Sequence, residues 1–250
     1  MKKTLLTILL CSGAMATVLP MSAMPTNPTE APVAEKSRNV IARMELPAFS
    51  GIYCDVVAHI TIEQGNEYLI EAQGPEHIIQ LIEPEVHREG GTLTIKSAKE
   101  YKVERNNGIT IRIVTPTIDM VYNDGVGNMH VKGNVKTSMM TVTNEGVGNV
   151  TIDNLQCEIL QVINEGVGNI NITGQATQRA VFKTEGVGSI NAGNLVTPEL
   201  TAELCGVGSI ECHATERLTC KANGVGNIYY AGDPKQTNIS NNSIGKVKKR

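Results

Sequence analysis

A Gly-Val-Gly tripeptide followed by Asn or Ser recurs through the second half of the chain and constrains its fold more than any other feature. The copies start at Gly125, Gly146, Gly166, Gly186, Gly206 and Gly224, and Ser243-Ile244-Gly245-Lys246 is a degenerate seventh copy. Successive copies lie 21, 20, 20, 20, 18 and 19 residues apart. A nearly fixed period of this length is the signature of a solenoid, in which each repeat contacts only its neighbours.

Each repeat shows the in-out-in alternation of a half-buried strand directly after its glycines. The first inward position holds Met129, Val150, Ile170, Ile190, Ile210 and Ile228, and the second holds Val131, Ile152, Ile172, Ala192, Cys212 and Tyr230. A later inward pair is Met140 and Val142, then Leu160 and Val162, Ala180 and Phe182, Leu200 and Ala202, and Cys220 and Ala222. Repeats stacked at ~4.8 Å would bury these side chains against the same positions above and below.

These patterns predict an all-β protein whose repeats form a parallel β-helix of ~20-residue coils. The glycines fit tight corners, which require a positive φ or an approach too close for a Cβ atom. We expect the turns inside each coil near Gly133, Asn154, Gly174 and Gly193-Asn194. The chain has only two Phe and no Trp, which suits a narrow aliphatic core between strands.

The chain divides into a leader, a linker and one predicted domain. Residues 1–23 are the expected signal peptide and residues 24–38 a Pro-rich extended linker. Residues 39–250 are the expected single β-helical domain. Within it we distinguish an N-terminal β part, 39–118, from the glycine-marked coils, 119–250.

The N-terminal β part contains short strand patterns separated by turns. Val56 to Glu63 is a predicted strand, and Tyr68 to Ala72 is its predicted hairpin partner. Thr92 to Lys96 and Ile109 to Val114 alternate in the same way, whereas Glu76 to Leu81 is a predicted single helical turn.

The first residues indicate export. Lys2 and Lys3 precede an apolar run, and cleavage is expected after Ala16 or Ala23. No later segment reaches the ~20 consecutive apolar residues of a membrane helix, so we expect no transmembrane segment. The expected location is the periplasm, the cell surface or the extracellular space. Cys11 lies in the leader after the large Leu10, which argues against its lipidation.

The mature chain is acidic overall, because 20 basic residues oppose 25 acidic ones after the leader is removed. This balance argues against a nucleic-acid partner, which favours a basic face. The basic residues are dispersed along the chain, which ends in a short basic segment, Lys246-Val247-Lys248-Lys249-Arg250. Lysines at an exposed strand edge discourage further pairing. End-to-end association of solenoids nevertheless stays open.

Four carboxylates form the most distinctive polar pattern. Asp124, Glu145, Glu165 and Glu185 each precede a glycine corner, and Cys205 and Asn223 continue the column. Stacked like charges raise one another's pKa unless a cation or donors intervene. One hypothesis is a stripe that binds a divalent cation or a glycan. The alternative, which we favour, is that the side chains spread into water and maintain solubility.

A second column follows the corners. Asn128, Asn149, Asn169 and Asn227, with Ser189 and Ser209, are expected to form a hydrogen-bonded ladder. The Gly-Val-Gly segments do not indicate a nucleotide site, because the third glycine of the dinucleotide-binding motif is missing and no helix follows.

The remaining reactive residues do not form a recognisable site. Cys205, Cys212 and Cys220 with His213 lack the short Cys pair of zinc sites, and Cys212 and Cys220 fall on inward columns, so we expect them in the core. Cys205 is the expected exposed thiol. His59, His77, His87 and His130 are scattered. The sequence therefore predicts no catalytic, cofactor-binding or metal-ligating residue.

The tandem Gly-Val-Gly coils, the segment Phe49-Ser50-Gly51-Ile52 and the lysine-rich ending together resemble the putative auto-transporter adhesin head GIN domain family. This family of exported proteins is common in Bacteroides-like bacteria. The resemblance covers about residues 39–250 and implies a right-handed parallel β-helix with an adhesin-like role. It implies no ligand or catalytic residue that could be carried over.

The sequence leaves three functions open. The first is a non-catalytic, adhesin-like binding module that presents a rigid solenoid surface to a glycan or to an envelope or host protein. The second is a structural or regulatory envelope component that binds another envelope protein. The third is a carbohydrate-active enzyme, which would need long loops and a carboxylate-lined cleft. Candidate surface contacts are the four carboxylates and Tyr229, the outward member of the only adjacent aromatic pair.

Overall fold

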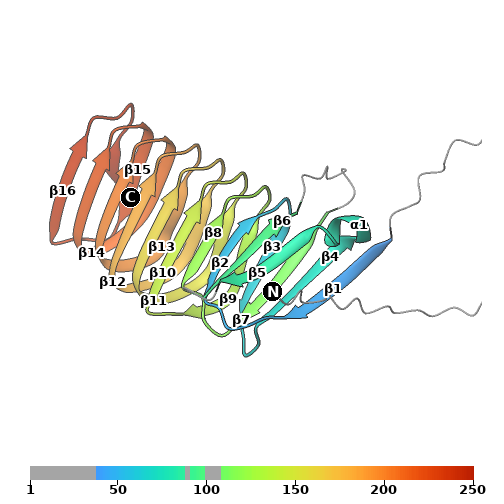
Figure 1. The fold of residues 1–250 in the computed structure, drawn as a ribbon. Coiled ribbons are helices and arrows are strands. Elements are labelled where there is room, and N and C mark those ends of the chain that lie inside the picture. The colour runs from blue at the N-terminus through green and yellow to red at the C-terminus, as the bar shows by residue number, and fades with distance from the viewer. Residues whose placement is uncertain (1–37, 88–90, 99–107) are drawn as a thin grey trace, which may run out of the picture.

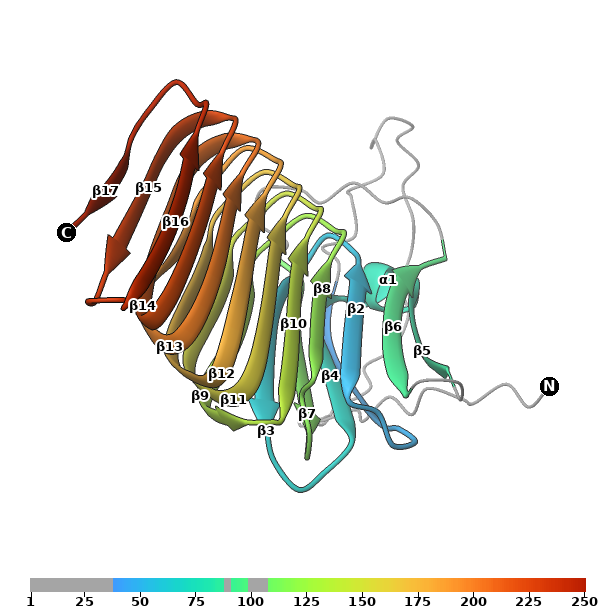
Figure 2. The ribbon, with the colours of Figure 1, turned by 90° about the vertical axis from the view of Figure 1, so that its left-hand side faces the viewer.

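The computed structural model describes residues 38–87, 91–98 and 108–250, which fold as a stack of β-strand coils (Figure 1). The expected signal peptide lies outside the described residues, and so does the expected linker except for Arg38. The coils advance steadily from the N-terminal end to the C-terminal end, and their strands run side by side (Figure 2). The predicted parallel β-solenoid is therefore confirmed, with about six turns.

The N-terminal part contributes the first eight strands and one short helix. These are β1 (Asn39–Glu45), β2 (Gly51–Asp55), β3 (His59–Gln64), β4 (Leu69–Pro75), α1 (Glu76–Ile79), β5 (Ile82–His87), β6 (Thr92–Ser97), β7 (Thr110–Thr115) and β8 (Met120–Asn123). The glycine-marked coils contribute β9 (Met129–Lys136), β10 (Met139–Asn144), β11 (Val150–Asn164), β12 (Ile170–Thr184), β13 (Ile190–Leu204), β14 (Val207–Ala222), β15 (Val225–Ala231), β16 (Gln236–Asn241) and β17 (Val247–Lys249).

Two ladders of strands face each other across the core. The front sheet runs from β6 through β2, β8 and β10 into the second halves of β11 to β14 and ends at β16. The back sheet runs from β7 through β3 and β9 into the first halves of β11 to β14, then to β15 and β17. These pairings are parallel. The glycine corners lead the chain from the front sheet to the back sheet.

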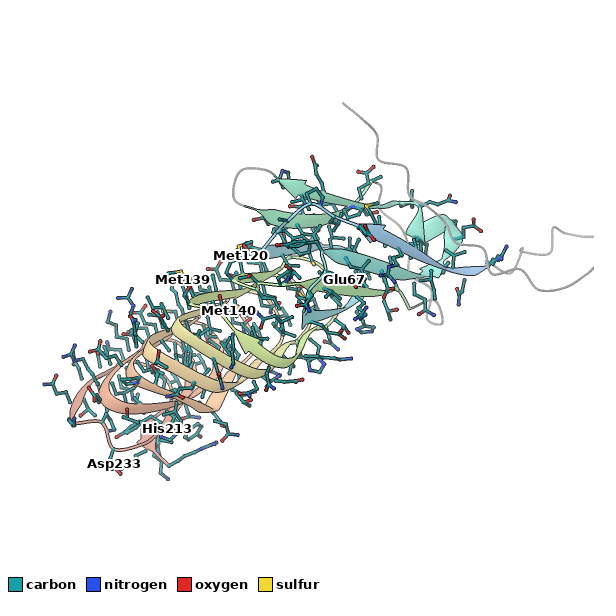
Figure 3. The ribbon with its side chains drawn as sticks, turned by 90° about the horizontal axis from the view of Figure 1, so that it is seen from below. Glu67, Met120, Met139, Met140, His213 and Asp233 are labelled. Atoms are coloured by element: carbon teal, nitrogen blue, oxygen red, sulfur yellow. The ribbon has the colours of Figure 1, made fainter. Side chains whose placement is uncertain are left out.

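The predicted inward columns form the core. Ile170 pairs with Ile190 in adjacent coils, and both are fully buried. The alternation is sharp, since the neighbours Met139 and Met140 on β10 are 50% and 0% exposed (Figure 3). Adjacent coils thus bury one another's aliphatic side chains. Burying a side chain of this size contributes roughly 1.5–3 kcal/mol.

The glycine corners use both reasons expected for glycine. The second glycine of each corner has a strongly positive φ, for example +136° at Gly168. The first glycine is close to the coil before it, since a Cβ atom on Gly166 would lie 2.2 Å from the carbonyl oxygen of Gly146. A Cβ atom at either glycine would thus collide with the backbone of the preceding coil. Val56-Val57-Ala58 occupies this corner in the coil of β2 and β3, and no described Gly-Val-Gly coil precedes it.

The predicted hairpin of Val56 to Glu63 with Tyr68 to Ala72 is wrong. β4 pairs antiparallel with β1 and β7, whereas β3 pairs in parallel with β7 and β9. The physical reason is that β3 belongs to the first coil and uses its edges for the stack. Gln64 holds the C-terminal end of β3 against the end of β9, because Gln64 Nε2 donates to the carbonyl of Lys136 and Gln64 Oε1 accepts from Lys136 N.

The strand predicted from Val56 begins only at His59, because Val56 to Ala58 form a corner, whereas the other two strands and the helical turn expected in the N-terminal part are confirmed. The strands expected at Thr92 to Lys96 and Ile109 to Val114 are β6 and β7. The helical turn is α1, which buries Ile78 and Ile79 against β4 and β1. Figure 1 shows α1, β1 and β4 together at the N-terminal end of the stack.

The register of the fifth coil differs from the expected alignment. We aligned Cys220 with Leu200, but Leu218 pairs with Leu200 and Cys220 pairs with Ala202. The cause is the 18-residue interval between Gly206 and Gly224, which shortens this coil. The shortening falls at the turn after Glu211. Glu211 is level with Asn191, whereas His213, two residues later, is level with Val196.

Candidate functional site

Three columns of side chains run along the glycine corners and define one surface, the glycine-corner face. The carboxylate column is Asp124, Glu145, Glu165 and Glu185; the valine column is Val126, Val147, Val167, Val187, Val207 and Val225; and the amide column is Asn128, Asn149, Asn169, Ser189, Ser209 and Asn227. Members of one column lie one coil apart because each corner hydrogen-bonds to its neighbours, as Glu165 N does to the carbonyl of Asn144.

The valine column is exposed along its whole length. Its six members are between 46% and 54% exposed, and their backbones form parallel bridges from one coil to the next. The glycines on both sides keep the corner tight, so the valine side chain between them points away from the core. Exposed apolar side chains in a continuous stripe are unusual for a protein surface and mark interaction sites. These valines are not among the candidate contacts expected from the sequence.

The carboxylate column is exposed, and its first members accept hydrogen bonds from tyrosines. The Tyr53 hydroxyl donates to Asp124, and the Tyr122 hydroxyl bonds to Glu145. Burial, these hydrogen bonds and the negative charges raise the pKa of both phenols well above the ordinary value. At the other end, Lys183 Nζ lies 2.9 Å from Glu185.

Tyr53 and Tyr122 stack on adjacent coils of the front sheet, with ring centroids 5.0 Å apart. Lys96 Nζ lies 5.4 Å from the Tyr53 ring centroid, within the range of a cation–π contact. This pair is not among the candidate residues expected from the sequence, although both tyrosines precede an aspartate by two residues, at Asp55 and Asp124.

The amide column forms the expected ladder through side-chain acceptors and backbone donors. Asn128 Oδ1 accepts from Asn149 N, and Asn149 Oδ1 accepts from Asn169 N, each over 2.9 Å. Asn169 Oδ1 continues the series to Ser189 N. Each asparagine therefore ties its own corner to the next coil, which confirms a structural role for the column.

A second asparagine ladder lies inside the core. Asn123 Nδ2 donates to Asn144 Oδ1 over 2.7 Å, and Asn144 Nδ2 donates to Asn164 Oδ1 over 3.0 Å. Asn164 Nδ2 then donates to the carbonyl of Gly168. Thr184 occupies the next level, and its buried hydroxyl has no hydrogen-bond partner. This ladder was missed, because these residues directly precede the carboxylates and resemble ordinary turn residues.

The cysteines lie where the inward columns predict. All five in the described chain are free thiols; Cys212 and Cys220 are buried and Cys205 is exposed. Burial raises the pKa of Cys220 to about 12 and that of Cys157 to about 11. Among residues 38–87, 91–98 and 108–250, no three His, Cys, Asp or Glu side chains are grouped as metal ligands would be.

The model of the family described as putative auto-transporter adhesin, head GIN domain, matches residues 48–234. The chain belongs to this family. The match includes β2, β3 and every Gly-Val-Gly corner up to Gly226, so the resemblance expected from the repeat is confirmed.

Solved structures of other proteins share the head GIN domain fold. A putative adhesin from Bacteroides fragilis NCTC 9343 is 32% identical, with a TM-score of 0.81 over 85% of this chain and 97% of that chain. A putative adhesin from Parabacteroides distasonis ATCC 8503 is 20% identical, with a TM-score of 0.63 over 86% of this chain and 98% of that chain. A putative lipid binding protein from the same organism is also 20% identical, with a TM-score of 0.61 over 86% and 98%. A comparison with curated proteins finds no match.

In this head GIN domain, Tyr229 lies apart from the four carboxylates. It is on β15 of the back sheet, level with Glu211 of the coil before it. The Arg250 guanidinium lies 4.8 Å from the Tyr229 ring centroid and forms two hydrogen bonds with Glu211. The structure thus brings the carboxylates together on the glycine-corner face and places Tyr229 beside a separate recess. No helix within the described residues is long and apolar enough to cross a membrane.

Proposed function

We propose that this protein is an exported, non-catalytic, adhesin-like binding module that presents its glycine-corner face to a protein partner outside the cytoplasm. The valine column carries the proposal. Six half-exposed valines follow one another on adjacent coils, so an apolar stripe lies on a scaffold whose backbone is hydrogen-bonded at every corner. Binding to a rigid surface costs little ordering entropy, which favours recognition.

The charge beside the stripe indicates the partner's chemistry. Asp124, Glu145 and Glu165 line one side of the valine column, and Lys183 accompanies only the last carboxylate, Glu185. A partner surface that combines apolar side chains with Lys or Arg would satisfy both columns together. Such complementary charges raise the association rate and select the partner.

Two further observations support this assignment. Membership of a family described as adhesin heads supports a binding role outside the cytoplasm, and the expected signal peptide supports export.

The described histidines give no support to an enzyme. His130 does lie 2.6 Å from Asp153, but both side chains are about 40% exposed.

The experiment compares binding by the protein and by a Val147→Thr/Val167→Thr/Val187→Thr variant. Threonine keeps the β-branched shape and removes apolar contact area. The immobilised probes are mucin, fibronectin and an envelope preparation of the producing bacterium. We expect saturable binding to at least one probe and a loss of at least about tenfold in the variant.

The matched control changes three outward residues of the front sheet, Thr141→Ala, Gln161→Ala and Thr201→Ala, and should bind as the unaltered protein does. Equal binding by the valine variant, or no saturable binding to any probe, would refute the proposal. Binding to the envelope preparation alone would favour the structural or regulatory envelope component over the adhesin.

A further inference from the structure

A recess opens on the back sheet at the turn where the fifth coil is shortened. We call it the corner recess and define it by Asn191, Gly193, Asn194, Glu211, Tyr229 and Arg250. It has a volume of about 330 Å³ and draws its residues from successive coils near the C-terminal end. This volume is within the usual range for small-molecule sites, roughly 300–1,000 Å³. His213, which follows this turn, and Asp233 mark that end of the molecule in Figure 3.

The recess follows from the register of two coils. Between Asn191 and Val196, β13 has four residues, whereas β14 has only Cys212 between the paired residues Glu211 and His213. β15 repeats the short path, since Ala231 pairs with His213. The longer turn of β13 therefore projects beyond the shorter turns of the two coils that follow it. A change of period visible in the sequence creates the concave surface.

The floor of the recess is apolar and its walls are polar. Ile172 and Cys212 are buried to 1% exposure at the floor. On the wall, the Arg250 guanidinium donates to Glu211 over 2.8 Å and 2.5 Å and lies over the Tyr229 ring.

One amide of the wall, that of Asn191, is also held in place by a neighbouring coil. Asn191 Nδ2 donates to Asn171 Oδ1 over 2.8 Å, which fixes the orientation of this amide. Asn191, Glu211 and Arg250 are therefore positioned before any ligand arrives, so little ordering entropy is lost on binding.

These features select the ligand. Glu211 and Arg250 neutralise each other, so the side chains that line the recess carry no net charge to attract a strongly anionic or cationic ligand. Their remaining hydrogen-bonding capacity suits a molecule with many hydroxyl groups. A sugar ring places an apolar C–H face and a rim of hydroxyls on one small rigid body. An apolar floor with a few fixed polar groups complements it.

We propose that the corner recess binds a neutral sugar ring, a hexose or an N-acetylhexosamine. None of the residues that define the recess belongs to the three columns of the glycine-corner face, so this inference holds or fails independently of the proposed protein partner. Glu211 and Arg250 bind the hydroxyls, Asn191 and Asn194 discriminate their positions, and Tyr229 with the floor packs against the ring.

The test uses saturation-transfer NMR on the full chain with glucose, galactose, mannose and N-acetylglucosamine as separate probes. We expect saturable transfer to at least one of them. Gly193→Leu should fill the recess, since a Cβ there makes only an ordinary contact 3.6 Å from Glu211 Oε2. Arg250→Ala should remove the guanidinium donors. Each variant should weaken binding at least about tenfold.

Gly108→Leu is the matched control, because Gly108 has nothing within 4 Å of a Cβ position, and it should bind as the unaltered protein does. The Val147→Thr/Val167→Thr/Val187→Thr variant should also keep sugar binding, which separates this site from the proposed protein interface. If Gly193→Leu fails to fold, Arg250→Ala decides alone, since the Arg250 side chain is 55% exposed.

The proposal is overturned if none of the four sugars shows saturable transfer, or if the folded recess variants bind as well as Gly108→Leu. Exclusive binding of N-acetylneuraminate or glucuronate, offered as further probes, would overturn the neutral assignment.

Discussion

Asn144 donates a hydrogen bond from its side-chain amide to Oδ1 of Asn164, one coil further on and 3.0 Å away, inside a largely aliphatic core. Asn144 also accepts from Asn123 over 2.7 Å. An amide has both a donor and an acceptor, so identical residues in a stack satisfy one another. A shift of one residue would turn these amides outward, and the ladder therefore opposes register slips between coils.

Asn144→Ala should destabilise the protein by about 2–4 kcal/mol, because it leaves the Asn123 donor and the Asn164 acceptor buried without their partner. Chemical denaturation measures the change in the free energy of unfolding. Asn154→Ala is the control, since Asn154 donates to Asn134 in the same way but in an exposed position, and it should cost less than about 1 kcal/mol. Equal losses for the two variants would contradict a special role for the buried ladder.

Thr184→Val should stabilise the protein by about 1 kcal/mol. The Thr184 hydroxyl is fully buried and has no hydrogen-bond partner, and valine has nearly the same shape without the polar atom. The melting temperature and the denaturant midpoint should both rise. A fall in either would show that the hydroxyl has a stabilising role in solution.

Gly166→Ala should destabilise the fold by about 3 kcal/mol or more, because the new methyl group would lie 2.2 Å from the Gly146 carbonyl oxygen. Gly108→Ala provides the comparison, since a Cβ there meets nothing within 4 Å. Circular dichroism during denaturation measures both. Similar stability of the two variants would mean that adjacent corners can separate without loss.

Tyr53 and Tyr122 should ionise later than ordinary tyrosines, because burial and the neighbouring carboxylates raise their pKa above the usual value of 10.0. Their contribution to stability is present below about pH 10, the pKa in the unfolded chain, and is lost as the pH rises through the raised pKa of the folded state. Near-ultraviolet difference absorbance follows the ionisation. Tyr122→Phe should remove one of the tyrosine ionisations that occur above the ordinary pH range. Loss of an ionisation near pH 10 would contradict the raised pKa of Tyr122.

Cys205 should be the thiol of the described chain that reacts with Ellman's reagent in the folded protein. Cys54, Cys157, Cys212 and Cys220 are buried, and burial raises the pKa of each. Thiolate formation and access both limit the reaction. The Cys205→Ser variant should therefore react with one equivalent less under native conditions. No difference between the two proteins would show that this corner is covered in solution.

The repeat made most of the fold predictable. Six glycine corners at a nearly constant period fixed which residues stack, so the burial of Ile170 on Ile190 and the amide ladder through Asn149 could be derived without coordinates. The pairing partners of Tyr68 to Ala72 could not be derived in this way. Tyr68 to Ala72 alternates as a hairpin strand would, but periodicity does not reveal which edge a strand pairs with, and β4 pairs with β1 and β7 instead.

The candidate sites were only partly predictable. The carboxylate column is visible as a repeated position, whereas its hydrogen bonds to Tyr53 and Tyr122 depend on side-chain reach between coils. The corner recess was hidden for a related reason. The shortened interval before Gly224 is plain in the sequence, but only the paired register shows that the loss falls beside Glu211 and not at the other turn.

Because the corners are equivalent, the number of coils in a fold of this kind can change without changing how adjacent coils meet. Each one meets its neighbours through the same backbone contacts, so removing or adding a whole coil between Gly146 and Gly206 joins surfaces that already match. A cut of half a coil would join the front sheet to the back sheet and destroy the stack. Insertion or loss of complete coils can therefore tune how far the molecule extends, and how many equivalent contacts it offers, while the chemistry of each contact stays constant.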